Sequence, residues 1–134
     1  MFKKLKLESK PGSLRIVEKA IDEVTYDLGI SQENYGKILV STLEGVNNAI
    51  LHGNHSDPMK MVHVEIAFVN NQLKIKISDE GKGFIPENVP DPTIPENREE
   101  LNGRGVFLMS RLADKIKFSK KGSTVTMIFI NIVS

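Results

Sequence analysis

The segment that decides the fold is VHVEIAFVNNQLKIKISD, residues 62–79. On both sides of Asn70-Asn71, apolar residues alternate with more polar ones, the pattern of strands with one buried face. The asparagine pair predicts a tight turn between the strands. The segment therefore predicts a β-hairpin whose core-facing residues are Val62, Val64, Ile66, Phe68, Leu73, Ile75 and Ile77.

Two helices are predicted before the hairpin. Residues 2–7 can form a short strand, and Ser13 is the expected N-cap of a first helix that ends at Gly29. Ser31 can cap a second helix that runs to about residues 52–53. The apolar positions with helical spacing are Val17, Ala20, Ile21, Val24 and Leu28 in the first helix, and Leu39, Leu43, Val46 and Ile50 in the second.

After the hairpin, residues 85–102 carry four prolines and several acidic residues, which predicts a long loop. Long loops in compact domains are often lids or binding loops. The remaining elements are expected to be a short helix at residues 106–113, a strand at 115–118, a turn at Lys121-Gly122 and a closing strand at 124–132.

These elements predict an α+β fold. Helices and strands are segregated, so we expect a two-layer α/β sandwich with the helices on one face of a mixed, mainly antiparallel sheet. With 134 residues and 40% apolar composition, the chain is expected to form a single domain over residues 1–134.

Composition also limits the function classes. No signal peptide or membrane-spanning segment is expected, and the absence of cysteine excludes disulfides and thiolate sites and fits the cytoplasm. A net charge of +1 with positive and negative residues evenly mixed predicts no broad basic field. We therefore expect neither nucleic acid nor a membrane as a direct partner.

Asp79 ends the second hairpin strand, on the face of Ile75 and Ile77, because side chains alternate with period two. A carboxylate directed inward needs a donor, which can be a backbone amide, a side chain or a ligand amine. Alone, Asp79 could equally cap the following turn. Gly81 and Gly83 favour a ligand, since glycine lets the backbone turn sharply or a flat group approach.

Glu44, Asn48 and His52 are spaced four apart and share one stripe of the second helix, beside its apolar line. A carboxamide oxygen can ligate Mg²⁺, and a carboxylate one turn away can orient or deprotonate a nucleophile. An isolated pair of this kind is usually a solvated helix edge, and His52 alone is more simply a helix-end residue. The pair becomes a candidate site only together with the other motifs.

Gly103, Arg104 and Gly105 directly precede the last predicted helix. Free amides at a helix N-terminus favour anions, glycine allows close approach of a phosphate, and arginine adds a permanent charge. By itself this motif could be a flexible loop end, and the acidic run at residues 96–100 is best explained as a solvated surface.

In order and spacing, these motifs together resemble the GHKL, or histidine-kinase-like ATPase, superfamily with the Bergerat fold. Residues 44–48 resemble its N box, residues 79–83 its first glycine box, residues 85–102 its ATP lid and residues 103–105 its second glycine box. Within the superfamily, the chain is most similar to small bacterial anti-sigma factors and serine-protein kinases of partner-switching systems. Residues 48–53, 91–97 and 103–109 carry that likeness.

The resemblance implies that Asp79 receives the adenine amino group of ATP and that Gly83 lets the ring lie close. It implies that Asn48 holds the Mg²⁺ that bridges the phosphates and that Glu44 is a general base toward an attacking hydroxyl. The other nucleotide-binding residues that it implies are Gly81, Gly103, Arg104, Gly105, Val106 and Phe107, the last two through their amides, with Ser123 assisting at the adenine.

One position departs from the family pattern. Some relatives place an arginine just before the second glycine box to meet the terminal phosphate, whereas Leu101 and Asn102 stand there in this chain. Arg98 or Arg104 could substitute.

The function implied is phosphoryl transfer from ATP to a serine or threonine of an anti-sigma factor antagonist, with sequestration of a sigma factor as a second activity. Such transfer depends mainly on positioning and charge neutralisation. Two alternatives remain: a nucleotide-gated module that holds a regulator without phosphorylating it, and a degenerate fold with an empty pocket. Glu44 favours the kinase, because binding alone needs no base. Relatives often form homodimers, and the sequence leaves the oligomeric state open.

Overall fold

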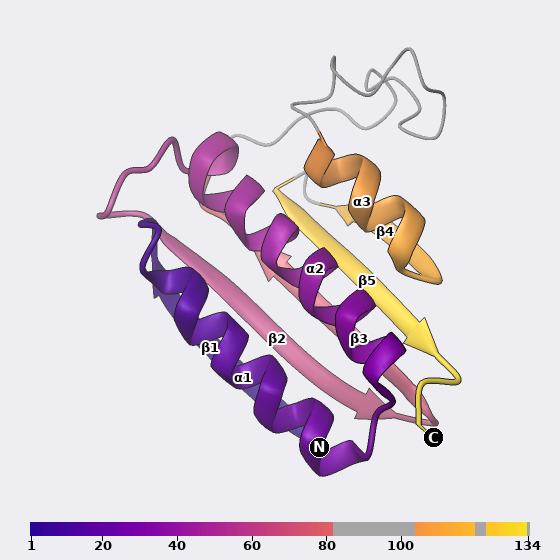
Figure 1. Cartoon of the computed structure of the whole chain (residues 1–134). Helices are drawn as coiled ribbons and strands as arrows, with labels where there is room; N and C mark the ends of the chain where they lie inside the picture. The colour runs from indigo at the N-terminus through magenta and orange to yellow at the C-terminus, as the bar shows by residue number, and fades with distance from the viewer. Residues whose placement is uncertain (82–103, 120–122, 134) are drawn as a thin grey trace.

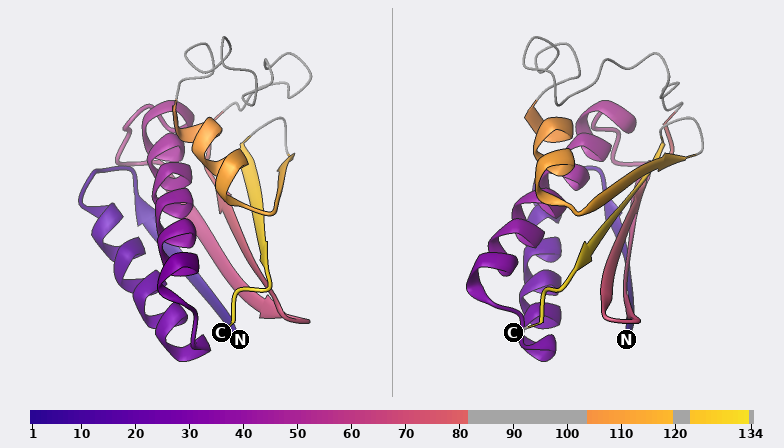
Figure 2. Two further views of the ribbon diagram at one scale, coloured as in Figure 1. Left: turned by 45° about the vertical axis from the view of Figure 1, so that its right-hand side comes forward. Right: turned by 90° about the vertical axis from the view of Figure 1, so that its right-hand side faces the viewer.

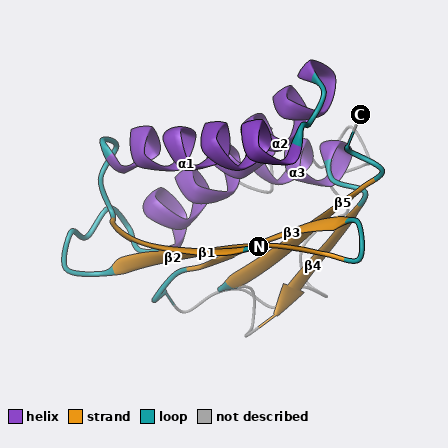
Figure 3. Ribbon diagram, turned by 90° about the horizontal axis from the view of Figure 1, so that it is seen from below, coloured by secondary structure: helices purple, strands orange, loops and turns teal. Residues whose placement is uncertain are grey.

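The computed structural model describes residues 1–81, 104–119 and 123–133. Three helices lie on one face of a five-stranded sheet (Figures 1 and 3). The strands, in sheet order, are β1 (Phe2–Glu8), β2 (Met61–Val69), β3 (Gln72–Ser78), β5 (Thr124–Ile130) and β4 (Lys115–Ser119). The helices are α1 (Ser13–Leu28), α2 (Gln32–Asn48) and α3 (Arg104–Leu112), and a π-helical turn, η1 (Ala49–Gly53), follows α2.

The expected two-layer α+β arrangement is confirmed. Every pairing between the described strands is antiparallel, so the parallel pair of a mixed sheet does not occur among them. The hairpin of β2 and β3 turns at Asn70 and Asn71, whose φ values of 55° and 62° are both left-handed. Two left-handed residues define the turn that matches the twist of paired strands, which explains the choice of asparagine.

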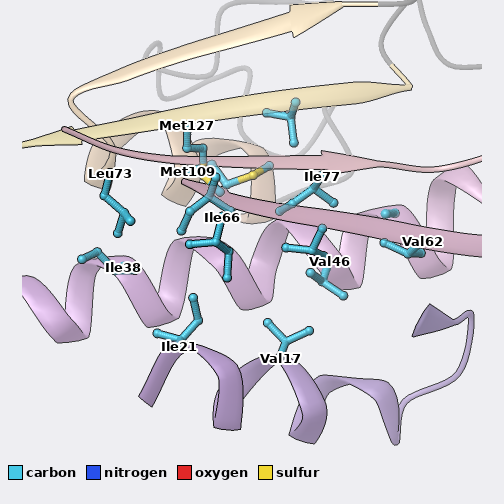
Figure 4. Close-up of a cluster of buried hydrophobic side chains, with 14 of the residues drawn as sticks. Val17, Ile21, Ile38, Val46, Val62, Ile66, Leu73, Ile77, Met109 and Met127 are labelled. Atoms are coloured by element: carbon cyan, nitrogen blue, oxygen red, sulfur yellow. The ribbon is translucent and has the colours of Figure 1, made fainter. Parts of the chain in front are cut away.

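The core lies between the helices and the sheet (Figure 4). The alternating residues of the hairpin point into this layer, where Ile66 pairs with Ile75 across the strands. The predicted hairpin face is therefore confirmed. The largest side chains with almost no exposed surface are Phe129, Ile21, Ile38, Ile50, Ile66, Leu73, Ile75, Ile77, Met109 and Met127.

Helix ends follow the sequence at two of the three expected positions. Gly29 ends α1 with a left-handed φ of 68°, and the Ser31 side chain accepts a hydrogen bond from the Asn34 amide at 3.3 Å. The prediction that Ser13 caps α1 is wrong. The N-cap is Gly12, and the Ser13 hydroxyl instead donates to the carbonyl of Glu8 at 2.7 Å, tying the helix to β1.

The buried face of α2 is shifted from the predicted line. Leu39 and Leu43 are only partly buried, whereas Ser41 and Thr42 are fully buried. Their hydroxyls donate to carbonyls of the preceding turn, at 2.6 Å from Thr42 to Ile38, so burial leaves no unmet donor. A pattern based on apolar residues alone could not find this face. Its buried members are Ile38, Ser41, Thr42, Gly45 and Val46.

The C-terminal elements agree with the prediction to within two residues. The last helix begins at Arg104 rather than at residue 106, and the closing strand ends at Ile130, beyond which Asn131 has a φ of 55°. Val133 then forms an isolated bridge with Ile30. The predicted Lys121-Gly122 turn lies outside the described residues. No helix in the described ranges is long and apolar enough to cross a membrane.

None of the described helices lies on the other face of the sheet (Figure 3), where six lysines of the strands are found. Glu65 lies between two of these lysines in one cross-strand row and forms an ion pair of 3.7 Å with Lys76. The lysines of this face are Lys4, Lys6, Lys74, Lys76, Lys115 and Lys117.

Candidate functional site

The site begins where Gly45 of α2 packs against both the sheet and α3. Gly45 is buried there, and a Cβ atom on it would stand 2.6 Å from Cδ1 of Ile77 and 3.1 Å from Sδ of Met109. Glycine inside a helix is intrinsically unfavourable, so this close approach explains its presence. Asn48 lies three residues further along the same side of α2, because residues three apart share a helix face. Glu44 and Asn48 are both partly buried on their stripe.

The end of α2 widens into η1. The amide of Asn54 donates to the carbonyl of Ala49 at 2.8 Å, five residues back, which is the hydrogen bond of a π-helical turn. Such turns are rare and occur often at functional sites. The turn brings Gly53 and Asn54 against the end of β3, whereas His52 is exposed.

Asp79 lies directly after β3 and is held by two backbone hydrogen bonds. Its amide donates to the carbonyl of Ser123 at 2.9 Å, and its Oδ1 accepts from the amide of Gly81 at 2.8 Å. Among residues 1–81, 104–119 and 123–133, no ion pair involves Asp79 and no donor bonds its Oδ2. The predicted inward carboxylate is thus half-buried with one oxygen left for another donor.

Burial raises the pKa of Asp79 above its ordinary value, because the charged form loses solvation. The Gly81 amide and the positive charge of Lys60 act in the opposite direction and lower the pKa, but burial has the larger effect. A carboxylate in this environment gains from a hydrogen-bond donor such as an amine, which replaces part of the lost solvation.

Two glycines leave room for the Asp79 carboxylate. A Cβ atom on Gly53 would stand 2.2 Å from Oδ2 of Asp79, and one on Gly81 would stand 2.0 Å from the carbonyl oxygen of Gly53. Real Cβ atoms essentially never approach so closely. The end of α2 and the Asp79–Gly81 turn are therefore packed backbone against backbone, which brings the stripe of Asn48 and the carboxylate of Asp79 to one end of the fold.

The structure places the Asp79–Gly81 turn, the end of α2 and the start of α3 at one end of the fold. Asp79, Gly81 and the backbone of Ser123 adjoin, and Figures 1 and 2 show the end of α2 and the start of α3 at the same end of the molecule. Gly83, Gly103 and the predicted lid at residues 85–102 lie outside the described residues. The backbone of Arg104, Gly105, Val106 and Phe107 forms the first turn of α3.

The roles of Gly45, Gly53 and Asn54 at this site were not predicted from the sequence. A glycine inside the otherwise regular second helix and a Gly-Asn pair directly after the Glu44 stripe were the available signals. Asn54 has 0% exposed surface and three side-chain hydrogen bonds. A polar residue between two predicted elements is ordinarily taken for a surface turn, so its burial depends on contacts that only the fold creates.

The donor set fits a ligand that carries both an amine and phosphates. The Oδ2 of Asp79, which no described residue bonds, suits an amine, and the amide of Asn48 suits Mg²⁺, which keeps water and substrate phosphates among its ligands. No group of three or more histidine, cysteine, aspartate or glutamate side chains that could hold a metal occurs in the described part of the chain. These residues fit a metal held largely by the phosphates of a nucleotide, with one protein ligand.

The chain is similar to several known proteins. A family model described as the histidine kinase-like ATPase domain matches residues 7–129. The anti-sigma F factor of Anoxybacillus flavithermus is 32% identical over 92 residues, which are 63% of this chain and 62% of that protein. The serine-protein kinase RsbW of Listeria monocytogenes is 24% identical over 130 residues, which are 92% of this chain and 83% of that protein.

A solved structure agrees with the fold. The RsbU and RsbW domains of Rv1364c from Mycobacterium tuberculosis match with a TM-score of 0.68 and 17% sequence identity, over 97% of this chain and 32% of that one. At that identity the likeness shows the fold alone. The chain spans less than two thirds of the length of the anti-sigma F factors that it matches. The resemblance drawn from the motifs is confirmed at the level of the family.

Proposed function

Because the chain belongs to the histidine kinase-like ATPase family, we propose that it is an ATP-binding serine/threonine protein kinase of the anti-sigma factor type. It phosphorylates an anti-sigma factor antagonist and sequesters a sigma factor in the cytoplasm. The names of two relatives, anti-sigma F factor and serine-protein kinase RsbW, support this class of partner. The observation that carries the proposal is the half-buried Asp79 carboxylate with one oxygen that no described donor bonds.

At the adenine end, Asp79 accepts a hydrogen bond from the exocyclic amine of the base. Gly81 donates to Oδ1 and so fixes the carboxylate, which leaves Oδ2 for the ligand. Gly83 is proposed to let the ring lie flat against the backbone, and Ser123 to support it from its position just before β5. Guanine carries an oxygen in place of the amine and would face the carboxylate with an acceptor, so the same contact selects adenine.

At the phosphate end, Asn48 provides an amide oxygen to Mg²⁺, which neutralises phosphate charge when bound. Glu44, one turn earlier on the same stripe, accepts the proton of the attacking serine or threonine hydroxyl. The hydroxyl oxygen bonds to the γ-phosphorus while the bond to the β–γ bridging oxygen breaks, and ADP leaves. The residues proposed to contact the phosphates are Gly103, Arg104 and Gly105, with the amides of Val106 and Phe107.

Transfer of labelled γ-phosphate tests the proposal. Wild-type chain, Glu44→Gln and Asp79→Asn would each be incubated with ATP, Mg²⁺ and an antagonist domain encoded beside the gene. We expect labelling by the wild type, loss of labelling with retained ATP binding for Glu44→Gln, and loss of both for Asp79→Asn.

The three outcomes separate the hypotheses. ATP binding without labelling of any neighbouring antagonist, together with no effect of Glu44→Gln, would make the chain a nucleotide-gated binding module. An empty pocket would show as no shift of the melting temperature with Mg-ATP, since a ligand at 100 times its Kd adds about 2.7 kcal/mol to the free energy of unfolding.

A further inference from the structure

Asn54 is a fully buried amide next to the proposed adenine end of the site. Its side chain has 0% exposed surface, and a buried amide is tolerated only when its donors and acceptor are paired. Asn54 belongs to none of the motifs that define the site and follows the last residue of η1.

The side chain bonds in three directions. Oδ1 accepts from the amide of Glu80 at 2.8 Å, while Nδ2 donates to Oγ of Ser9 at 2.9 Å and to the carbonyl of Met61 at 3.0 Å. Three of the four hydrogen bonds that an asparagine amide can make are thus formed within the protein. The orientation of the amide is fixed by these partners, because a flip would set acceptor against acceptor at Met61 and donor against donor at Glu80.

Each partner belongs to a different part of the fold. Ser9 follows β1, and its hydroxyl also donates to the carbonyl of Lys60 at 2.6 Å. Met61 begins β2, and its amide donates to the Glu80 carboxylate. Glu80 lies between Asp79 and Gly81, so the turn that carries the candidate adenine acceptor is attached through both its backbone and its side chain.

Asn54 also fixes the end of the helix that carries Asn48. Its own amide donates to the carbonyl of Ala49 and so closes η1. One residue therefore joins the last turn of the α2 segment to the turn after β3. The close contact of Gly53 with Asp79 and Gly81 adds a steric limit to this connection.

We propose that Asn54 is a positioning residue, one that sets the distance and orientation of Asp79 relative to the Asn48 stripe and thereby sets the preference of the site for adenine. The inference rests on the proposed ATP binding. Asn54 touches no part of the nucleotide in this scheme and acts only through Glu80 and the end of η1. Loss of its side chain frees the Asp79–Gly81 turn, so adenine recognition weakens more than phosphate recognition does.

A base-selective binding measurement tests this role. ATP and inosine triphosphate differ in the group that Asp79 accepts from, because inosine carries an oxygen in place of the exocyclic amine. Affinities of both would be measured in Mg²⁺ with the full chain, for the wild type and for Asn54→Ala. We expect the ratio of the two affinities to fall about tenfold, the equivalent of 1.4 kcal/mol. Affinity for inosine triphosphate should change far less.

Ser9→Ala is the matched control. It removes one partner of the same buried amide but leaves the bond from Glu80 to Oδ1, so it should lower the melting temperature while the affinity ratio stays at the wild-type value. General destabilisation lowers both affinities together and leaves the ratio unchanged. Asn54→Ser, whose side chain is too short to reach Glu80, replaces Asn54→Ala if that variant does not fold.

The outcomes distinguish two failures. A folded Asn54 variant with the wild-type ratio overturns the positioning role, even if its stability is reduced. A wild-type chain that binds neither nucleotide overturns the proposed function and the inference together. An equal loss of ratio in Ser9→Ala would show that base preference does not depend on the bond from Glu80 to Oδ1 of Asn54, and this would also overturn the positioning role.

Discussion

The carboxylate of Asp79 fills the space that a side chain on Gly53 would need. A Cβ atom on Gly53 would stand 2.2 Å from Oδ2 and 2.3 Å from Cγ of Asp79. The two residues are 26 positions apart in the sequence, and neither is constrained by the other until α2 and β3 meet in the fold. This contact makes the position of the carboxylate sensitive to a single methyl group.

We expect Gly53→Ala to displace Asp79 and weaken ATP binding by at least about tenfold, a loss of roughly 1.4 kcal/mol. Gly53 does not have a left-handed backbone, so alanine is conformationally acceptable there and the change reports the steric contact. Overpacking of this kind costs about 1–3 kcal/mol of folding free energy. Chemical denaturation and nucleotide titration measure the two effects. Gly12→Ala, where a Cβ atom meets nothing within 4 Å, is the control and should retain ATP binding.

Asp79→Asn should stabilise the nucleotide-free protein at neutral pH while abolishing ATP binding. Asparagine carries no charge to desolvate, and its oxygen can keep the bond from the Gly81 amide. Its NH₂ group then takes the place of Oδ2 and opposes the amine of adenine. Melting temperatures with and without Mg-ATP measure both effects, and a variant that still responds to ATP would refute the assignment of Asp79.

The raised pKa of Asp79 also predicts how folding stability and ATP affinity depend on pH. The folded protein holds a proton on Asp79 at pH values where the unfolded chain has already released it, so unfolding in this window releases a proton. The contribution of Asp79 to stability therefore falls as pH rises from the ordinary carboxyl pKa to the raised one. ATP affinity moves the opposite way, because protonation removes the acceptor. Stability curves of wild type and Asp79→Asn should converge at acid pH, and curves that separate there instead would contradict this.

Gly45 and Gly36 offer a matched pair within α2. A Cβ atom at Gly36 meets nothing within 4 Å, so Gly36→Ala should stabilise the protein by about 1 kcal/mol through helix propensity alone. At Gly45 the new methyl group would press on Ile77 and Met109, and overpacking of about 1–3 kcal/mol offsets that gain. Equilibrium unfolding in urea compares the two. Equal stabilisation by both changes would mean that the core yields at Gly45 without strain.

Asn48→Ala should remove most of the effect of Mg²⁺ on ATP binding. The amide of Asn48 is the proposed protein ligand of the metal, whereas Asp79 is proposed to bind the base. Asn48→Ala should therefore weaken binding of the metal and phosphates, and Asp79→Asn should weaken binding of adenine. In EDTA the wild type and Asn48→Ala should bind ATP with similar affinity, and with Mg²⁺ only the wild type should gain. Calorimetric titration in both buffers measures this, and an equal gain by the two proteins would exclude Asn48 as a metal ligand.

The hairpin could be predicted from the sequence because local and global requirements agree there. The alternation of apolar residues and the inward register of Asp79 both follow from the two-residue period of a strand. The two asparagines mark the turn, because asparagine readily adopts a left-handed backbone. The caps at Gly29 and Ser31 are local for the same reason. The placement of Asp79 and Gly81 was predictable to the extent that they belong to one strand and its turn.

The contacts between elements could not be predicted in this way. Thr42 counts as polar in any hydrophobic pattern, yet its burial is tolerated because its hydroxyl bonds within its own helix. Asn54 looks like a loop residue until β1, β2 and the turn after β3 surround it. Ser13 shows the same limit at a helix end, since its hydroxyl bonds to the strand before the helix instead of capping it.

Because of the π-helical turn, the site depends on the number of residues between Asn48 and Asn54. An α-helix advances by 3.6 residues per turn, and η1 accommodates its additional residue by bonding Asn54 to Ala49 rather than to Ile50. Deleting one residue between Asn48 and Gly53 would turn the Asn54–Ala49 bond into the ordinary bond of an α-helix and would narrow the wide turn that sets Gly53 against Asp79. Indels in this stretch should therefore be far less tolerated than substitutions of its exposed side chains, Leu51 and His52.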